Sequence, residues 1–384
     1  MEKQTGTPKL RFPKFKGEWE KKKLGEVAEK IGDGLHGTPI YSDDSDIYFI
    51  NGNNLTNGKI EINENTKKVD HSIFAKNDKG LNSNTLLVSI NGTIGNISKY
   101  SNEKVMLGKS VGYFNFKENT DFYYHIFQTD TIQDFFISEL TGSTIKNLSL
   151  KTLRNTVISF PTLPEQTRIA SFFTAIDKKI AEFKQKKTLL EQYKKGVMQK
   201  LFSQELRFKD ENGKDFPEWE EKKLGEIAKI TTGSSNREDS NLDGKYIFFD
   251  RSIDLRFSNR FLFDVEAIIV PGEGQEFVPK YFKGKFDLHQ RTYAIMNFEN
   301  QNGKFLFYSI GYNSNHLNSH AVGSTVKSLR LPMFEKMPIS LPCLSEQTKI
   351  ANFLSAIDEK INHTENQIQK TQEWKKGLLQ RMFV

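Results

Sequence analysis

Two glycine-rich loops contain side chains that could contact a nucleic acid. Residues 32–39 read Gly-Asp-Gly-Leu-His-Gly-Thr-Pro, and residues 231–237 read Thr-Thr-Gly-Ser-Ser-Asn-Arg. Hydroxyl, amide, imidazole and guanidinium groups can bond to phosphates and base edges, and glycine permits close approach of the backbone. The side chains predicted to contact DNA in these loops are His36, Thr38, Ser234, Ser235 and Arg237.

A second matched pair of segments has the form Gly-Ser-Thr-x-Lys, at residues 142–146 and 323–327. A hydroxyl-rich turn followed by a lysine can hold a phosphate group. Such turns also act as capping turns, and the two roles are compatible. The predicted DNA contacts in these segments are Ser143, Thr144, Lys146, Ser324, Thr325 and Lys327.

The richest basic and aromatic run occupies residues 280–292. Lysines neutralise phosphates, whereas arginine pairs with guanine and glutamine with adenine in the major groove. Residues of these types are also common on any basic surface, so the run allows DNA contact without requiring it. The predicted contacts are Lys280, Lys283, Lys285, His289, Gln290 and Arg291.

Motifs of the common enzyme classes are missing from the sequence. It contains no phosphate-binding G-x-x-x-x-G-K-[ST] loop, no G-x-G-x-x-G after a predicted strand, no H-E-x-x-H, no G-x-S-x-G and no [ND]-P-P-[YF]. His316 and His320 are spaced by four, but residues 311–315 beside them read as a loop, which argues against a metal site. The acidic cluster at residues 43–46 favours a solvated turn over a cation site. We therefore expect no catalytic site, cofactor or metal in this chain.

The overall composition is basic and almost free of cysteine. The formal net charge is +7 and the pI is about 9.0, which favours acidic partners such as nucleic acid, although such an excess also serves solubility. Cys343 is the only cysteine, so no intrachain disulfide or cysteine-based zinc site can form. We expect a cytoplasmic protein without a membrane partner, because neither a signal peptide nor a long apolar span is apparent.

Two stretches of the chain are each written twice. Residues 18–26 return as 218–226 with eight of nine identical, and residues 163–180 return as 344–361 with twelve of eighteen identical. The offsets are 200 and 181, so the material between the repeated blocks is 19 residues shorter in the second half. This pattern predicts a duplicated frame that holds two unlike inserts.

Each half ends in a long helical segment with an apolar heptad seam, from Glu165 to Ser203 and again in the second copy. Pro164 and Ser345, each followed by a glutamate, are plausible signals for the first turn. Lysines and arginines near the other ends suit a helix C-terminus. The residues predicted to pair the two helices are Ile169, Phe173, Ile176, Ile180, Phe183, Leu190, Val197, Leu201, Ile350, Leu354, Ile357, Ile361, Ile368, Leu378 and Met382.

A long helix with a narrow apolar stripe cannot bury that stripe alone, so we expect the two helices to pair. Antiparallel pairing follows if an approximate two-fold axis relates the halves. In the alternative, each helix folds back on its own domain. The Leu-Arg-Phe segment at 206–208 follows the first helix, while its counterpart at 10–12 begins the chain. A symmetric arrangement would therefore place the N-terminal segment near the end of the second helix.

The inserts are predicted to be mostly strand with some helix. Short apolar runs at residues 47–50, 85–90, 246–249, 267–270 and 292–295 are separated by Asn-Gly and other glycine-rich turns, and a helix is expected around 123–139. The expected fold is mixed α/β, with two globular domains separated by a long antiparallel two-helix coiled coil and related by a pseudo-two-fold internal repeat.

Together these features resemble the DNA specificity subunit of type I restriction-modification systems. The likeness is carried by Trp-Glu-x-x-Lys-Leu-Gly-Glu at 19–26 and 219–226, by the runs at 32–39, 91–95 and 284–293, and by the helix entries Leu-Pro-Glu-Gln-x-x-Ile-Ala at 163–170 and Leu-Ser-Glu-Gln-x-x-Ile-Ala at 344–351. It covers nearly the whole chain, although Ser345 replaces the second proline. The implied organisation is an N-terminal segment of the repeated frame at 1–20, target recognition domains at 21–162 and 205–341, and long helices at 163–204 and 342–384.

The resemblance implies a non-catalytic subunit that recognises a split sequence in double-stranded DNA. Each recognition domain would read one half, and the helices would set the spacer. Two modification subunits that bind S-adenosylmethionine and methylate adenine would dock on the repeated frame, and restriction subunits using ATP and magnesium would join them. Two alternatives remain: a self-contained methyltransferase or nuclease, which the missing motifs disfavour, and a coiled-coil scaffold that binds only protein.

Overall fold

The chain forms two compact units in the computed structural model, which describes residues 6–142, 146–252 and 254–384. Unit 1 comprises Met1–Phe183 and Asn366–Val384, and unit 2 comprises Lys184–Glu365. Each unit thus takes one part of each long helix. The units therefore do not follow the linear order of the chain, and the two ends of the sequence belong to unit 1.

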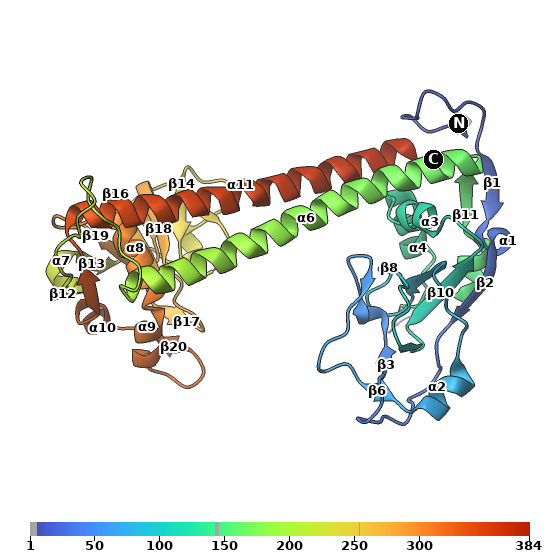
Figure 1. The fold of residues 1–384 in the computed structure, drawn as a ribbon, viewed down its shortest axis with the longest axis horizontal. Coiled ribbons are helices and arrows are strands. Elements are labelled where there is room, and N and C mark those ends of the chain that lie inside the picture. Colours follow the sequence, from blue (N-terminus) through green and yellow to red (C-terminus); the bar gives the residue numbers. More distant parts are fainter. Residues whose placement is uncertain (1–5, 143–145, 253) are drawn as a thin grey trace. The chain divides into compact units, whose positions relative to one another are not determined.

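Unit 1 consists of small sheets with short helices (Figure 1). The sheets have the strand orders β2-β10-β7-β8, β6-β3-β9, β1-β11 and β4-β5. Their strands are β1 (Glu20–Lys23), β2 (Ala28–Asp33), β3 (Ile47–Ile50), β4 (Leu55–Thr56), β5 (Lys59–Ile60), β6 (Lys68–Val69), β7 (Thr85–Ser89), β8 (Ile97–Lys99), β9 (Val105–Leu107), β10 (Val111–Phe116) and β11 (Val157–Phe160). The helices are α1 (Leu24–Val27), η1 (Gly52–Asn54), α2 (His71–Asn77), α3 (Thr120–Ile126), α4 (Asp130–Ser138) and α5 (Leu150–Asn155).

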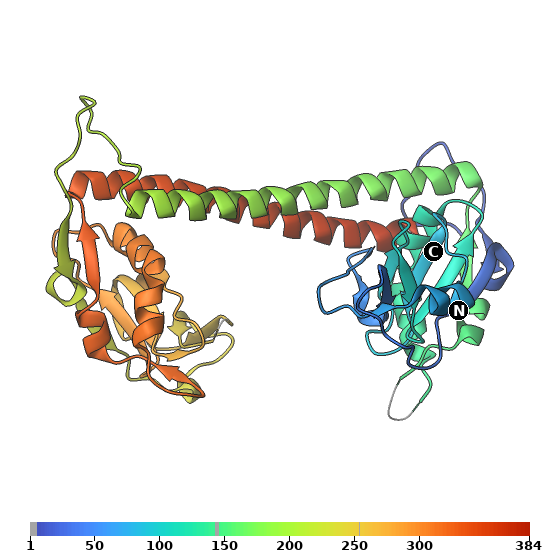
Figure 2. The same ribbon diagram turned by 60° about the horizontal axis from the view of Figure 1, so that its bottom comes forward.

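Unit 2 is built around a six-stranded sheet of order β13-β19-β16-β18-β14-β15, with the two-stranded sheets β12-β21 and β17-β20. Its strands are β12 (Glu220–Lys223), β13 (Lys229–Thr232), β14 (Tyr246–Phe249), β15 (Arg256–Ser258), β16 (Phe263–Pro271), β17 (Glu273–Gly274), β18 (Lys280–Leu288), β19 (Thr292–Met296), β20 (Lys327–Ser328) and β21 (Pro338–Leu341). The helices are α7 (Leu224–Ile227), η2 (Arg237–Asp239), α8 (Gly303–Tyr312), α9 (Ser314–His320) and α10 (Leu331–Glu335). Figure 2 shows α8 and α9, in orange, beside this sheet.

The strands predicted from the five apolar runs are confirmed as β3, β7, β14, β16 and β19. One of the predicted Asn-Gly turns, Asn57-Gly58, is also confirmed, since both residues have positive φ and join the hairpin strands β4 and β5. The single helix expected around residues 123–139 is two helices, α3 and α4. The break falls at Thr129, whose hydroxyl accepts a hydrogen bond from the amide of Ile132 and so caps the start of α4.

The repeated Trp-Glu segment forms the same structure in both units. Strand β1 pairs antiparallel with β11, and β12 pairs antiparallel with β21, in the same register relative to the repeat. A one-turn helix follows each strand, and a glutamate side chain caps it. Glu26 accepts a hydrogen bond from the Lys23 amide at 3.3 Å, and Glu226 accepts one from the Lys223 amide at 3.1 Å. These caps explain why the repeat contains Lys-Leu-Gly-Glu.

The two long helices are α6 (Leu163–Phe202, 40 residues) and α11 (Leu344–Met382, 39 residues). The fifteen seam residues predicted to pair the helices are all buried or half-buried. Most of those in 163–183 and 366–384 join the core of unit 1, and most of the others join the core of unit 2. Burial of this stripe supplies the apolar contact that an isolated amphipathic helix lacks.

Within each unit, the contacts between α6 and α11 run antiparallel. In unit 1, Lys375 pairs with Asp177 at 2.7 Å. In unit 2, Lys194 pairs with Asp358 at 2.6 Å, and Lys187 with Glu365 at 2.6 Å. Lys194 and Lys375 are counterparts in the repeat, so their main partner is the opposite helix rather than the helix end that the sequence suggested.

Each repeated aspartate also faces a polar side chain from its own unit. In unit 2, Tyr308 of α8 donates a hydrogen bond to Asp358 at 2.6 Å, and burial together with this bond raises the pKa of Tyr308. In unit 1, the counterpart position is occupied by His125 of α3, whose Nδ1 lies 3.8 Å from Asp177. Burial, reinforced by Lys375, lowers the pKa of His125 well below its usual value, so the imidazole stays neutral at pH 7.

A buried Arg–Glu pair ties the start of each long helix to the repeated Leu-Arg-Phe segment. In unit 1, Arg11 donates two hydrogen bonds to Glu165, at 2.6 and 2.7 Å. In unit 2, Arg207 donates two to Glu346, at 3.2 and 2.9 Å. The carboxylate side chains are 1% and 0% exposed. Each arginine also donates a hydrogen bond to a backbone carbonyl just before the repeated Glu-Trp. The guanidinium therefore holds both the start of the long helix and the loop that leads to the repeated strand.

The N-terminal segment lies against the end of α11, as the repeat predicted. The Leu10 amide donates a hydrogen bond to the Arg381 carbonyl at 2.8 Å, and the rings of Trp19 and Phe383 meet edge to face at 6.3 Å. In unit 2 the chain runs from the end of α6 into Leu206 without a break. The same frame is therefore formed by a continuous chain in unit 2 and by the two ends of the sequence in unit 1.

We expect Arg207→Met to lower the free energy of unfolding of the chain by about 3–5 kcal/mol, because it leaves the carboxylate of Glu346 buried without its cation. Chemical denaturation followed by circular dichroism measures this change. Lys222→Met is the matched control, since it removes a cation that is 44% exposed in the same unit. Equal effects of the two substitutions would contradict a structural role for the buried pair.

Candidate nucleic-acid interface

Three segments that are distant in the sequence meet in unit 2, and they contain most of the predicted contacts. The loop after β13 and the loop after β18 are joined by hydrogen bonds from the Gln290 amide to the Ser235 carbonyl at 2.9 Å and from the Gln290 side chain to Asn236. Strand β17 then pairs with β20, which places Lys327 opposite Gly274. A further bond, from the Gly272 amide to the Arg291 carbonyl, connects β17 to the loop after β18.

Unit 1 has a corresponding cluster. The loop after β2 meets the loop after β9 through a bridge between Leu35 and Gly108, and the segment containing Lys146 approaches Asn91 through Asn147. His36, Thr38 and Lys146 are exposed in this cluster. Ser143 and Thr144 lie outside the described residues, so their predicted contacts stay predictions.

The exposed polar side chains of these loops fit DNA contact, although several already have partners. His36 is bonded to Asp33 at 2.7 Å, and Arg291 donates to both oxygens of Glu273 at 2.8 and 3.1 Å. Burial lowers the pKa of His289, and its Nδ1 accepts a hydrogen bond from the Arg291 amide. The His289 side chain therefore stabilises the loop after β18 through this internal hydrogen bond. The exposed members of the unit 2 cluster are Ser234, Arg237, Gln290, Arg291, Ser324, Thr325 and Lys327.

Ser235 does not present its hydroxyl to a ligand, so its predicted DNA contact is wrong for this structure. The residue is fully buried, and its hydroxyl donates to Asp287 and accepts from Arg260 at 2.8 Å. Asp287 is also fully buried, and the guanidinium of Arg260 is the cation beside it. This cluster holds the loop after β13 against β18.

One glycine of each loop, Gly34 and Gly233, serves internal packing rather than the approach of a ligand. A Cβ on Gly34 would lie 2.2 Å from the Leu107 carbonyl oxygen, and one on Gly233 would lie 1.7 Å from that of Leu288. Only glycine permits these contacts. The sequence showed that glycine was present but could not distinguish contact with the protein's own backbone from contact with DNA.

The three predicted lysines of β18 differ in exposure and in their contacts. Lys283 and Lys285 are exposed, and Lys285 lies 4.0 Å from Asp264. Lys280 is half-buried and donates to the Ser252 carbonyl at 3.1 Å. The structure joins residues 289–291 to the other loops by hydrogen bonds, and it ties Lys280 to the loop after β14.

Sequence inspection missed two exposed arginines beside the unit 2 cluster. Arg251, directly after β14, is 59% exposed and lies 3.5 Å from Glu273, the same carboxylate that holds Arg291. Arg260 is 53% exposed and reaches Asp239 at 3.1 Å. Neither arginine belongs to a matched motif, so only the fold shows that they flank the cluster.

The segment containing His316 and His320 is helical, so the prediction of a loop beside it is wrong. Helix α8 extends to Tyr312, and α9 then carries both histidines, whose rings stack at 4.2 Å. Burial and the neighbouring His320 lower the pKa of His316. Among residues 6–142, 146–252 and 254–384, no group of three or more potential ligands is placed to hold a metal ion.

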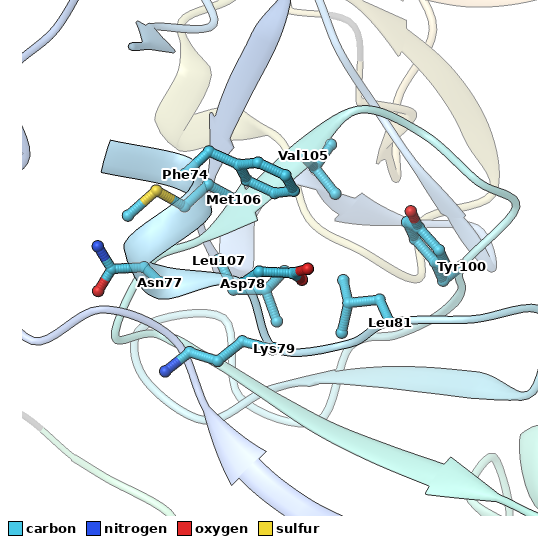
Figure 3. Close-up of a pocket in the computed structure, with 9 residues that line it drawn as sticks. All are labelled: Phe74, Asn77, Asp78, Lys79, Leu81, Tyr100, Val105, Met106 and Leu107. Carbon is cyan, nitrogen blue, oxygen red and sulfur yellow. The ribbon is translucent and has the colours of Figure 1, made fainter. Parts of the chain in front are cut away.

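Two cavities of the structure lie away from the predicted contacts. In unit 1, a cavity of about 140 Å³ lies between α2 and β9, where Phe74, Asp78, Tyr100 and Met106 line it (Figure 3). In unit 2, a cavity of about 380 Å³ lies between α6, α8 and the loop before β18. None of the predicted contact residues lines either cavity, so the candidate interface is a set of surface loops. In the described part of the chain, no helix has the length and apolar character of a membrane span.

Comparison with known proteins identifies similar chains. The sequence model of the family described as "Type I restriction modification DNA specificity domain" matches residues 16–192 and 217–372. The specificity subunit of the type I restriction enzyme EcoDI from Escherichia coli is 29% identical over 153 residues, or 40% of this chain and 34% of that protein. The MjaIX specificity subunit from Methanocaldococcus jannaschii is 27% identical over 244 residues, or 58% of this chain and 54% of that protein.

These alignments span about a third and a half of the two relatives, respectively. A solved structure shows the fold more completely. The crystal structure of a type I restriction-modification S subunit from M. genitalium superposes with a TM-score of 0.64 at 17% identity and covers 98% of this chain and 99% of that one. The mixed α/β fold is therefore shared.

We expect Gly233→Ala to lower the melting temperature of unit 2 by several degrees, because its Cβ would overlap the Leu288 carbonyl. Differential scanning calorimetry of the full chain measures the change. Gly196→Ala is the matched control, because that glycine lies within α6 with nothing near its Cβ, and the same substitution there should be neutral or stabilising. A neutral Gly233→Ala would contradict the tight packing of the loop.

Proposed function

The chain belongs to the type I restriction-modification DNA specificity family, and on this premise we propose that it is the sequence-specific DNA recognition subunit of a type I restriction-modification complex. The observation that carries the proposal is the recurrence of one loop cluster in both units with different exposed side chains. A repeated backbone frame with unlike side chains suits two sites that bind the same polymer but distinguish different sequences. Each unit reads one half of a bipartite target.

The long helices set the spacing between the two half-sites in this proposal. Helices α6 and α11 form an antiparallel coiled coil, and a pseudo-two-fold axis relates the halves of the chain. The support is the matched pair of interhelical ion pairs, Asp177 with Lys375 and Asp358 with Lys194, which obey the same offset as the sequence repeat. The seam residues that are buried in each unit give the apolar part of the same interface.

Catalysis belongs to other chains in this proposal. Two modification subunits, which bind S-adenosylmethionine and methylate adenine, dock on the repeated frame, because that frame offers the same surface twice. Restriction subunits bring ATP and magnesium. One similar solved structure, with a TM-score of 0.54 and 15% identity, is described by a title on complex assembly and conformational transition of the type I restriction-modification system. The proposed DNA target agrees with the basic net charge of +7.

An exchange of one insert tests the recognition role. We expect replacement of residues 221–341 by the insert of another family member to change one half of the methylated sequence and to leave the other half intact. The measurement is adenine methylation mapped across the genome of a host that carries the modification subunit with either chain. The unaltered chain is the control.

A change in both halves, or in neither, would overturn the two-reader proposal. Methylation of DNA by the purified chain alone would show that it is an enzyme. Binding to the modification subunit without any salt-dependent affinity for DNA would favour the protein-binding scaffold instead.

Shortening the helices tests the spacer. We expect deletion of one heptad from both α6 and α11, at facing positions, to shorten the unread spacer while the bases read on either side remain the same, because a whole heptad preserves the seam. Deletion of two residues from both helices is the control, since it rotates the seam by about 200° and should abolish stable pairing. An unchanged spacer after the heptad deletion would contradict the proposed role of the helices.

A further inference from the structure

The two units share one hydrogen-bonding frame around their recognition loops, although these loops have little sequence in common. In both units, a parallel pair of strands precedes a recognition loop. Strand β3 pairs with β9 in unit 1, and β14 pairs with β18 in unit 2. Four backbone hydrogen bonds then match between the units. In unit 1 they run from Leu35 N to Leu107 O, from Gly108 N to Ile50 O, from Ile90 N to Ser110 O and from Leu148 N to Ile90 O. In the same order, those of unit 2 run from Ser235 N to Leu288 O, from His289 N to Phe249 O, from Gly272 N to Arg291 O and from Leu329 N to Gly272 O.

This frame aligns the two units residue by residue without any gap in the loop after β9 and β18. Gly108 corresponds to His289 and Ser110 corresponds to Arg291, so the residue between them, Lys109, corresponds to Gln290. The parallel bridges Leu35–Gly108 and Ser235–His289 match as well. The next residue in each first loop therefore corresponds too, which aligns His36 with Asn236.

The paired positions are neighbours on the surface. In unit 2, the side-chain amide of Gln290 donates to the side-chain oxygen of Asn236. In unit 1, Leu35 and Gly108 form a β-bridge, and the residues directly after them are His36 and Lys109, respectively. Both of these residues are exposed. Gly108 is packed tightly, since a Cβ there would lie 2.3 Å from Asn51 Oδ1, so the backbone that presents Lys109 is held in place.

We propose that Lys109, beside His36, is a base-reading residue of unit 1, at the position that Gln290 occupies beside Asn236 in unit 2. The inference rests on the proposed function and adds the residues that distinguish the half-sites. Sequence motifs did not indicate Lys109, which lies in no matched segment, and Asn236 was not among the contacts predicted in the loop 231–237. Their roles follow from the hydrogen-bonding frame alone.

The other aligned positions fall into two groups: those with the same residue type in both units and those with different types. Lys146 and Lys327 correspond through Leu148 and Leu329, and both units have lysine there. A group that is the same in two unlike readers suits the phosphate backbone, which is the same for every sequence. Ser110 is committed internally, because its hydroxyl donates to Asn51 and accepts from the Gly52 amide. Lys109 and Gln290 are thus both exposed, and their side chains differ between the units.

The chemistry of the two side chains predicts different bases. The ammonium of Lys109 is a donor that suits the O6 and N7 acceptors of guanine, whereas the amide of Gln290 can donate and accept together, as adenine N6 and N7 require. Exchange of the two residue types should therefore exchange a preference for guanine and a preference for adenine at one position of each half-site.

The experiment selects bound sequences from a library of DNA duplexes with a randomised central region, using the full chain in complex with its modification subunits. We expect Lys109→Gln to change the preferred base at one position of one half-site by roughly tenfold or more, the discrimination of one good base contact. The reciprocal Gln290→Lys should change one position of the other half. Lys117→Gln is the matched control, because Lys117 is an exposed lysine at the opposite end of β10 from Lys109.

Several outcomes would overturn the proposal. One is that Lys109→Gln and Gln290→Lys both select the unaltered sequence; another is that Lys109→Gln weakens all sequences equally, which would make Lys109 a phosphate contact. A change in the half-site that the other unit reads would also overturn it. If the unaltered complex selects no sequence at all, the proposed function itself fails, which is a distinct result.

Discussion

The buried Arg–Glu pair at the start of each long helix is the constraint on which the rest of the structure depends. Glu165 and Glu346 lie where a helix N-terminus favours a carboxylate, but burial would make that charge costly without a paired guanidinium. Arg11 and Arg207 supply the cation and also hold the segment that leads to the repeated strands β1 and β12. One interaction therefore fixes the helix, the linker and the edge strand of each unit together.

A rigid frame of this kind separates constant from variable parts. Helix caps, the Arg–Glu fork and the interhelical ion pairs recur with the same residues, because each depends on one geometry. The recognition loops share backbone hydrogen bonds but differ in exposed side chains, as Lys109 and Gln290 illustrate. Backbone bonds require no particular side chain, so the loops can keep their shape while the groups that they present change. This is the physical basis for two different half-sites on one scaffold.

Elements with a strong periodic signal were predictable from the sequence, and isolated contacts were not. The heptad seam indicated α6 and α11 almost to the residue, and apolar runs bounded by glycine turns indicated β3, β7 and β14. The site was predicted less completely. Ser235 was expected to contact DNA, but its hydroxyl bonds to Asp287, 52 positions away. Arg251 and Arg260 were missed for the same reason, since their surroundings come from distant strands.

The sequence by itself determined the duplicated frame, the two long helices, the basic character and the family, because these depend on repetition and local periodicity. Only the tertiary structure decided which half of each helix joins which core, how the N-terminal segment completes unit 1, and which loop residues correspond between the units. Those relations depend on hydrogen bonds and ion pairs between residues far apart along the chain. Such contacts leave no spacing rule in the sequence, because the intervening loops can vary in length without breaking them.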